Sequence, residues 1–593
     1  MLKKFFFNVL SSFMGAWLAI VMSGLCIALV VLGILGILFG KHVKIEDGTV
    51  LKIELKGGLI ERDDPSQLDF YSLIAGRGVQ YQTLENLTAA IKEAKDNDKI
   101  KAIYLDCGML SSAPASINAL RDALIDFRKS GKPVFAYADQ YSQSSYYVAT
   151  AANELYVNPQ GSVDLHGLGG ETLFYKGLFD KIGVEFQVVR VGEGKSAVEP
   201  YTQTSMSDYA RNQTMQLIDT IWDGLRGTIA QSRGLSSAGI DSLINNYIPS
   251  IRTGVFALQH KLVDGTMYRH EFEDHIAKKV GQKDGLKLVV SAPDLASISS
   301  YYKKQGGDKQ IAVVYACGGI DTEMGGGINS AQLVNQIIEL GRDEKVKGLV
   351  LRVNSPGGSA YGSEQIWEAL EWFKKQNKPV AVSMGDYAAS GGYYISAAGN
   401  RIFADRFTIT GSIGIFGLIP NIHGLLEMIG INPQMVATNP QAQLFTLTSP
   451  LDEHQLASMQ QMVNEGYNLF VTRCAEGRNL PVDSIKSIAD GRPIPATVAL
   501  RYNLIDEIGS LKQAIEWTAK RAGISKDYHI GVYPELKTNL LVEIVKNGNG
   551  QLPASVENML LQNNWTQEML NRLSYILNAD RMRTEYPLLK LSM

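Results

Sequence analysis

The sequence predicts an α/β protein that consists of two tandem copies of one unit, preceded by a membrane-spanning helix. Three observations support this prediction: a long segment near the N-terminus carries no charge, the rest of the chain is similar to itself, and each copy alternates short β-rich runs with helical patterns. Such alternation favours parallel strands with helices on the faces of the sheet. At 593 residues the chain also exceeds what one hydrophobic core normally supports.

The uncharged segment at residues 13–40 is longer than the roughly 20 residues that cross the hydrocarbon core of a bilayer. Lys3 and Lys4 precede it, as in a signal peptide, but the apolar run is too long for a signal-peptide core and no small-x-small cleavage motif follows. We therefore expect an uncleaved signal anchor at residues 1–45 that contacts the lipid bilayer. Because long domains translocate readily behind a first anchor, the bulk of the chain is expected outside the cytoplasm.

The internal repeat covers most of the remaining chain and organises it into two domains. The matching segments are 99–106 with 345–352, 131–144 with 377–390, 146–157 with 393–404, 176–185 with 423–432, and 257–264 with 499–506. We expect a first domain at 46–285 and a second at 311–540, joined by a linker at 286–310 where the repeat lapses. Residues 541–593 are expected to form a polar tail with no recognisable chemistry.

The second copy shows the alternation of strands and helices most clearly. Residues 348–353 are expected to form a buried strand, and residues 363–376 have helical apolar spacing. A strand at 379–384 leads into a short helix, and another strand at 401–405 precedes a glycine-rich segment. Both copies are therefore expected to contain a largely parallel sheet.

The composition argues against several classes of function. A net charge of −3, without a basic run, argues against a nucleic-acid partner. Only four cysteines in a chain of this length argue against a disulfide framework. No cysteine pair has C-x-x-C spacing and the eight histidines show no ligand grouping such as HExxH, which argues against a metal site. We expect neither a metal site nor a cofactor.

The chemistry is expected where the two copies differ, and the first difference follows the first repeated strand. The second copy has NSPGG at residues 354–358, where the first has GMLSS at 108–112. A Pro-Gly-Gly turn leaves backbone N–H groups unobstructed and able to adopt positive φ, as an oxyanion hole requires. Only the second copy is expected to form such a hole.

The second difference surrounds Ser390, which stands at a strand-to-helix turn in AASGG at 388–392. The small neighbours let a substrate carbonyl approach, and the partial positive charge of a helix N-terminus favours a developing negative charge. The first copy has QSSY at 143–146, which keeps a serine without the small neighbours. Taken alone, a serine in AASGG is more often a packing position than a nucleophile.

The third difference is Lys195, in GKSAVEP at 194–200, whose place in the second copy is taken by Ala442. The copy without a hole thus keeps a lysine, which suggests one composite site. Taken alone, such a lysine is usually a solvated charge, and with a pKa of about 10.4 it could not accept a proton at neutral pH. We therefore expect Lys195 to be buried between the domains, close to Ser390, where desolvation lowers a lysine pKa.

At VNSPGGS (353–359), MGDYAASGGYYIS (384–396), TGSIGIFG (410–417) and GKSAVEP (194–200), the sequence resembles the long, two-domain form of the signal peptide peptidase A (protease IV) family. The resemblance implies tandem crotonase-like (Clp-protease-like) domains and a membrane-anchored serine endopeptidase with a Ser/Lys dyad. It also implies hydrophobic peptide substrates such as cleaved signal peptides, and assembly into a homo-oligomer. The implied location is the bacterial cytoplasmic membrane, with the catalytic domains on the periplasmic side.

The matching motifs also imply roles for individual residues. Ser390 would be the nucleophile and Lys195 the general base. Gly391, together with Gly357 or Gly358, would supply the N–H groups of the oxyanion hole.

Ser412, in TGSIG, is a candidate for orienting the lysine amine, and its alternative interpretation is a plain turn residue. Two other functions stay open at this point. A crotonase-fold enzyme acting on acyl thioesters would use similar glycine-rich turns but would not need Lys195. A catalytically silent membrane scaffold would leave Ser390 unreactive toward acylating probes.

Overall fold

The computed structural model describes residues 22, 45–62, 81–298, 308–322, 327–444, 446–524, 528–535 and 582–583. The expected membrane span at residues 13–40 lies outside these residues except for Met22. Within the described part of the chain, every helix is either too short or too polar to cross a bilayer. One of the two compact units consists of Met1–Lys44 and Lys537–Leu570, and of its residues only Met22 is among those that the structure describes.

The elements described below belong to the other compact unit, which comprises Ile45–Leu536 and Asn571–Met593. The expected first domain, 46–285, lies inside this unit, and the expected second domain, 311–540, does so up to residue 536. Both limits stay predictions. The expected C-terminal tail lies outside the described residues except for 582–583.

The first sheet contains parallel strands in the order β2-β1-β3-β4-β5-β7, and a further short strand pairs with β1. The strands are β1 (Thr49–Ile60), β2 (Tyr81–Thr83), β3 (Ile100–Ser111), β4 (Val134–Tyr141), β5 (Glu154–Val163), β7 (Gly265–Thr266) and β8 (Val289–Ser291). β8 lies within the expected linker at 286–310, so part of that segment joins the first sheet. The central strands are almost fully buried, as parallel strands covered on both faces usually are.

The first half of the chain also contains helices, several of which cover this sheet. They include α3 (Leu84–Asp96), α4 (Pro114–Arg128), α5 (Gln143–Ala149), α6 (Lys176–Ile182), α7 (Glu199–Thr202), α8 (Asp208–Arg233), α9 (Ser237–Tyr247), α10 (Gly254–Gln259), α11 (Arg269–Lys279) and α12 (Ala292–Ile298), with 3₁₀ turns at Ser196–Val198 and Pro249–Ile251. Thr83 caps α3 by accepting a hydrogen bond from Asn86 N. Phe272 of α11 stacks on Tyr137 of β4 with ring centroids 5.2 Å apart, which fixes α11 on the sheet.

The second sheet has the order β15-β13-β11-β10-β9-β17, and β12 pairs with both β11 and β16. Its strands are β9 (Gln310–Cys317), β10 (Val346–Ser355), β11 (Val380–Ala389), β12 (Arg401–Ala404), β13 (Ile409–Gly411), β15 (Pro493–Pro495), β16 (Glu507–Ile508) and β17 (His529–Tyr533). All pairs are parallel except β13 with β15. The repeated segments fall on equivalent strands, because β3, β4 and β5 in the first sheet correspond to β10, β11 and β12 in the second. The predicted duplication of an α/β unit is therefore confirmed.

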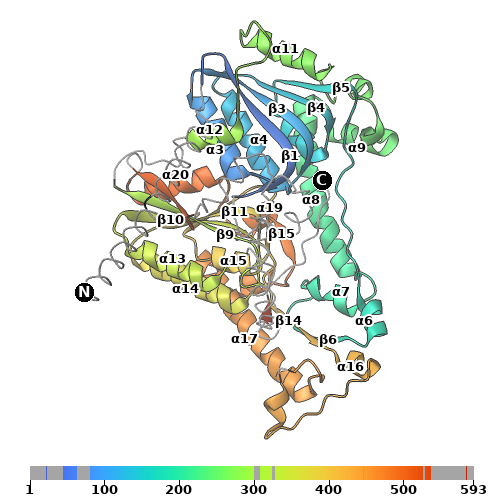
Figure 1. The fold of residues 1–593 in the computed structure, drawn as a ribbon. Coiled ribbons are helices and arrows are strands. Elements are labelled where there is room, and N and C mark those ends of the chain that lie inside the picture. The colour runs from blue at the N-terminus through green and yellow to red at the C-terminus, as the bar shows by residue number, and fades with distance from the viewer. Residues whose placement is uncertain are drawn as a thin grey trace, which may run out of the picture. The chain divides into compact units, whose positions relative to one another are not determined.

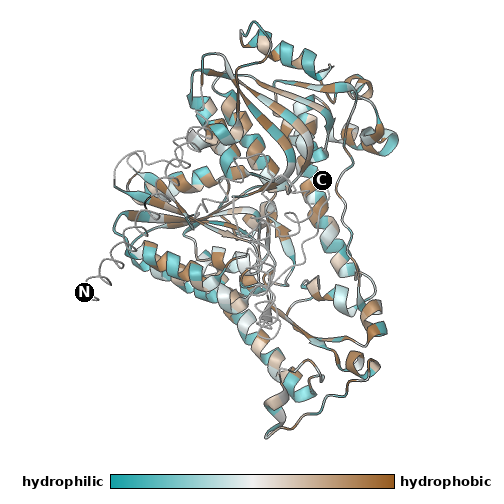
Figure 2. Ribbon diagram, viewed as in Figure 1, coloured by the Kyte–Doolittle hydropathy of each residue, from teal (hydrophilic) through white to brown (hydrophobic). Residues whose placement is uncertain are grey.

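The second half also contains helices that carry both hydrophilic and hydrophobic residues (Figure 2), and several of them cover the second sheet. They include α13 (Ser330–Arg342), α14 (Ala360–Lys375), α15 (Gly391–Ser396), α16 (His423–Met428), α17 (Glu453–Arg478), α18 (Val482–Lys486), α19 (Ala496–Arg501) and α20 (Leu511–Arg521), with a 3₁₀ turn at Pro440–Gln443. On α14 the residues Ile366, Leu370 and Phe373 are buried at helical spacing. The helices therefore bury one face against the strands.

A small third sheet joins the two halves of the chain. Strand β6 (Glu185–Arg190) from the first half pairs antiparallel with β14 (Phe416–Asn421) from the second (Figure 1). On the other edge of β14 lies β18 (Met582–Arg583), which also pairs antiparallel with it. Leu425 N also donates to Gly183 O at 2.8 Å, between the equivalent helices α16 and α6. Because β6 leads directly into the segment with Lys195, this pairing delivers that lysine to the second half.

Candidate active site

Ser390 lies in the turn between β11 and α15 and has an unusual backbone conformation. Its φ is 55° and its ψ is −119°, which is rare for a residue other than glycine and indicates strain held by the surroundings. Ser390 N donates to Gly411 O at 2.8 Å, and Ser390 O accepts from Tyr394 N at 2.9 Å. These bonds fix the turn, and the serine is fully buried.

Lys195 comes from the first half of the chain and is also fully buried. Its Nζ donates to Ser390 Oγ at 2.8 Å, to Ser412 O at 3.0 Å and to Ser412 Oγ at 3.0 Å. The structure thus brings three residues singled out from the sequence into direct contact. An amine and an alcohol at this separation are within the range for direct proton transfer.

The segment before Lys195 is held against the second half by backbone contacts. Val191 N donates to Ile415 O at 3.1 Å, and Gly194 N donates to Asp490 O at 2.8 Å. Gly192 has a φ of 91°, and a Cβ there would overlap Asp490. Glycine at this position therefore permits the close approach of the two halves.

Ser412 occupies a second strained position, with a φ of 51°. Ser412 N donates to Arg492 O at 2.9 Å, and Ser412 Oγ donates to Gly491 O at 2.9 Å. Because the hydroxyl hydrogen is directed at Gly491, the Ser412 oxygen is left to accept from Lys195 Nζ. A Cβ on Gly491 would lie 3.0 Å from Lys195 Cβ, so this glycine also shapes the lysine site.

The glycine-rich turn that follows β10 adopts the conformation predicted for it. Gly357 and Gly358 have φ values of 112° and 149°, and a Cβ on Gly358 would overlap the backbone of Ile320. Ile320 N donates to Gly357 O at 2.8 Å, whereas Gly357 N donates to Ser355 Oγ at 3.2 Å. The turn is therefore clamped against Ile320.

The turn and Ser390 lie on neighbouring strand ends. Ser355 at the end of β10 pairs with Ala388 of β11, and a Cβ on Gly392 would lie 2.6 Å from Ser355 O. The start of α15, including Gly391, therefore lies against the end of β10. This places the glycine-rich turn beside the serine.

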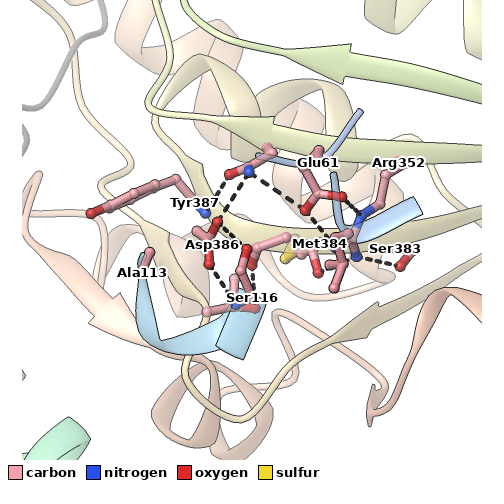
Figure 3. A network of polar contacts seen from close by, with 12 residues as sticks. Glu61, Ala113, Ser116, Arg352, Ser383, Met384, Asp386 and Tyr387 are labelled. Atoms are coloured by element: carbon pink, nitrogen blue, oxygen red, sulfur yellow. Dashed lines mark hydrogen bonds and ion pairs between the residues drawn. The ribbon is translucent and has the colours of Figure 1, made fainter. Parts of the chain in front are cut away.

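Two features of the site escape sequence reasoning. One is the loop at Gly491 and Arg492, whose carbonyls hold Ser412 and which carries no local motif. The other is a buried polar network that includes Glu61, Arg352 and Asp386 and is drawn in Figure 3. A comparison of every aligned position in the two copies could have found part of this polar network.

This network contains an ion pair, between Glu61 and Arg352. The Glu61 carboxylate raises the pKa of Arg352, against the lowering effect of its burial. Burial raises the pKa of Asp386, and the nearby Glu61 acts in the same direction, whereas hydrogen bonds from Ser116 oppose the rise. Across the described residues, no grouping of three or more His, Cys, Asp or Glu side chains could hold a metal ion.

Comparisons with known proteins match this chain over most of its length. The model of peptidase family S49 matches residues 126–283 and 372–525, and a Clp protease model matches residues 316–412. Protease 4 of Salmonella typhi is 36% identical over 498 residues, which are 81% of this chain and 79% of the relative. Protease 4 of Haemophilus influenzae is 34% identical over 439 residues, which are 72% of this chain and 71% of the relative.

A plant protein is also similar. Serine protease SPPA, chloroplastic, of Arabidopsis thaliana is 28% identical over 494 residues, which are 81% of this chain and 70% of the relative. The family model matches each half separately, in agreement with two copies of a Clp-protease-like fold. The chain therefore belongs to peptidase family S49, as a serine peptidase of the long, two-domain signal peptide peptidase A (protease IV) form.

Proposed function

We propose that the protein is a membrane-anchored serine endopeptidase in which Ser390 is the nucleophile and Lys195 is its general base. The observation that carries this proposal is the 2.8 Å contact between Lys195 Nζ and Ser390 Oγ, with both side chains excluded from water. Burial disfavours the charged form of an amine. The two Ser412 acceptors on Nζ are neutral oxygens, which stabilise an ammonium less than a carboxylate would.

A neutral amine has two hydrogens, which can be donated to the two Ser412 oxygens, and a lone pair that accepts from the Ser390 hydroxyl. In the first step, this amine accepts the hydroxyl proton as Ser390 Oγ bonds to the carbonyl carbon of the substrate peptide. The resulting ammonium then donates that proton to the leaving amine, and an acyl-enzyme forms. A water molecule attacks the acyl-enzyme, with Lys195 again accepting a proton, and Ser390 is regenerated. No other proton carrier is needed in this scheme.

We assign the oxyanion hole to the N–H groups of Gly358 and Gly391. The contact of Gly357 N with Ser355 Oγ directs that N–H away from a substrate and supports Gly358 as the donor from the turn. Gly391 directly follows the nucleophile at the start of α15, a position from which its N–H can reach the same oxygen. Ser412 is assigned to orienting the amine of Lys195 toward Ser390.

The substrate class and location are also part of the proposal. Residues 13–40 would anchor the chain in the bacterial cytoplasmic membrane, with domains 46–285 and 311–540 on the periplasmic side. An anchor raises the effective concentration of membrane-resident peptides, which suits apolar peptides such as remnants of cleaved signal peptides. Assembly into a homo-oligomer is proposed from the resemblance to the family alone.

A serine-reactive acylating probe tests this function. It should modify Ser390 stoichiometrically, and Ser390→Ala and Lys195→Ala should lose both labelling and cleavage of a hydrophobic peptide. Ser144→Ala is the matched control, because Ser144 is the equivalent buried serine of the first half and should leave both unchanged. Full activity of Ser390→Ala would overturn the proposal, and labelling without peptide cleavage would favour an acyl-thioester enzyme instead.

A further inference from the structure

Strand β11, which leads to Ser390, contains a bulge just before that residue. Strands β10 and β11 pair regularly up to Val353 and Met384, and pairing resumes at Ser355 and Ala388. Residues 385–387 of β11 therefore lie opposite a single residue of β10. Bulges next to active sites redirect a strand, and this one sets where the end of β11 points.

Asn354 is the single residue opposite the bulge, and its side chain satisfies the bulged backbone. Asn354 Oδ1 accepts from Tyr387 N at 3.0 Å, and Nδ2 donates to Asp386 Oδ2 at 3.2 Å. The backbone carbonyl of Asn354 accepts from Gly318 N at 2.9 Å. Gly318 lies two residues before Ile320, which holds the glycine-rich turn. Asn354 therefore connects the bulge to that turn.

Asp386, within the bulge, also reaches across to the first half of the chain. Its Oδ1 accepts from Ser116 N at 2.8 Å and its Oδ2 from Ser116 Oγ at 2.7 Å (Figure 3). Ser116 is in the first turn of α4, where backbone N–H groups have no acceptor within the helix and the helix dipole favours an anion. A carboxylate of the second half thus caps a helix of the first.

Glu61, which directly follows β1, adds a second contact from the first half. Its carboxylate accepts from Arg352 Nη2 at 2.6 Å and from Arg352 Nε at 3.2 Å. Arg352 Nη1 in turn donates to Met384 O at 2.9 Å, directly before the bulge. Both contacts of Arg352 are buried and lie directly before the bulge.

The other half of the duplicated chain lacks this arrangement. The repeat aligns Gly108 with Asn354 and Gln140 with Asp386. The fold of the unit therefore forms without an asparagine and a carboxylate at these places. They occur only in the half that carries Ser390, which argues that they serve the site rather than the sheet.

We propose that Asp386 is a positioning residue. It holds Asn354 in the bulge while it caps α4, and it thereby positions Ser390 relative to the glycine-rich turn that follows β10. The geometry of the site then depends on docking of the first half. The inference rests on the function proposed above. The first half then contributes a positioning contact to the nucleophile as well as its general base.

The test compares two carboxyls that both accept hydrogen bonds from α4. Asp386→Ala and Asp386→Asn remove or weaken the contact at the bulge. Asp405→Asn is the matched control, because Asp405 Oδ2 accepts from Asn118 Nδ2 of α4 at 2.8 Å without touching the bulge. The readouts are the rate of Ser390 acylation by the probe, kcat and KM for a hydrophobic peptide, and the midpoint of urea unfolding.

Asp386→Ala should slow acylation and lower kcat by roughly a hundredfold, as a small misplacement of reacting groups does, with KM changed by less than about threefold. Asp386→Asn should be intermediate, because its Oδ1 can still accept from Ser116 N. The acylation rate of Asp405→Asn should be within about twofold of the wild-type rate, even if its urea midpoint falls as far as that of Asp386→Ala. Should Asp386→Ala fail to fold, Ser116→Ala removes only one of the two bonds and should slow acylation by about three- to tenfold.

Acylation of Asp386→Ala at the wild-type rate would overturn the inference, as would equal slowing in Asp386→Ala and Asp405→Asn. The proposed function fails separately, if Ser390→Ala still reacts with the probe or cleaves peptide. Labelling that depends on Ser390 but not on Asp386 would therefore reject only the positioning role.

Discussion

Lys195 Nζ lies 2.8 Å from Ser390 Oγ, although the two residues are 195 positions apart in the chain and come from different copies of a repeated unit. The contact depends on β6, which crosses to pair with β14 of the other copy and ends five residues before the lysine. Neither copy holds both groups, since Ala442 replaces the lysine in one and Ser144 stands in ordinary helical backbone in the other. The proposed site is therefore divided between the two halves of the duplicated chain.

Gly358→Ala should lower kcat for peptide cleavage by about a hundred- to a thousandfold, the usual cost of losing one oxyanion donor. The added methyl would overlap the backbone of Ile320, and alanine disfavours a φ of 149°, so the turn must move. Gly131→Ala is the control, because Gly131 also has a positive φ, 82°, but has open space around its Cβ position. An unchanged kcat in Gly358→Ala would remove this glycine from the proposed hole.

Ser412→Ala should lower kcat by about two- to tenfold with little change in KM, because Lys195 loses one of its acceptors while Ser390 is untouched. Steady-state kinetics with a hydrophobic peptide measure both constants. Ser363→Ala is a suitable control, since Ser363 is equally buried but bonds only within its own helix, to Ser359 O at 2.7 Å. A kcat equal to that of the wild type would leave Ser412 as a plain turn residue.

Stability should depend on pH through Asp405, because burial raises the pKa of this carboxyl to about 7. An unfolded aspartate has a pKa of about 3.9, so between pH 4 and 7 the unfolded chain ionises while the folded protein keeps the proton. The free energy of unfolding should therefore fall as pH rises through this window, by on the order of a few kcal/mol from this group. Below pH 4 the group should contribute no slope.

Urea denaturation of the wild type and Asp405→Asn across pH 4–8 measures this contribution. The difference in unfolding free energy, wild type minus variant, should decrease with rising pH and level off above about pH 7. A difference that stays constant across this range would show that Asp405 ionises normally in the folded protein.

Much of the fold is readable from the sequence because the repeat reports the same unit twice. Weak strand signals at 99–106 and 345–352 reinforce each other, and both segments lie in central parallel strands. The short strand β8 within the expected linker at 286–310 could not be predicted, since three residues carry too little periodicity. The pairing of β6 with β14 is set by tertiary contacts and has no local signature.

The candidate site, like the fold, can be predicted from the sequence only in part. Ser390, Lys195 and the Gly357-Gly358 turn stand out because the two copies differ there in ways that chemistry explains. Asp386 does not, because a single carboxylate after a strand usually indicates a solvated turn, and its partner Ser116 becomes apparent only when α4 docks. Apart from the expected approach of Lys195 to Ser390, the contacts between the halves are the part of the site that the sequence alone does not reveal.

The pH dependence of Ser390 acylation in wild type and Lys195→Ala tests the central claim most directly. With an uncharged amine as the base, the wild-type rate should rise with pH along a single ionisation and level off. The rate of Lys195→Ala should not show that ionisation, and at the pH of the wild-type plateau it should be about a hundred- to ten-thousandfold lower than the wild-type rate. Acylation of Lys195→Ala at the wild-type rate, with the same pH profile, would contradict the account.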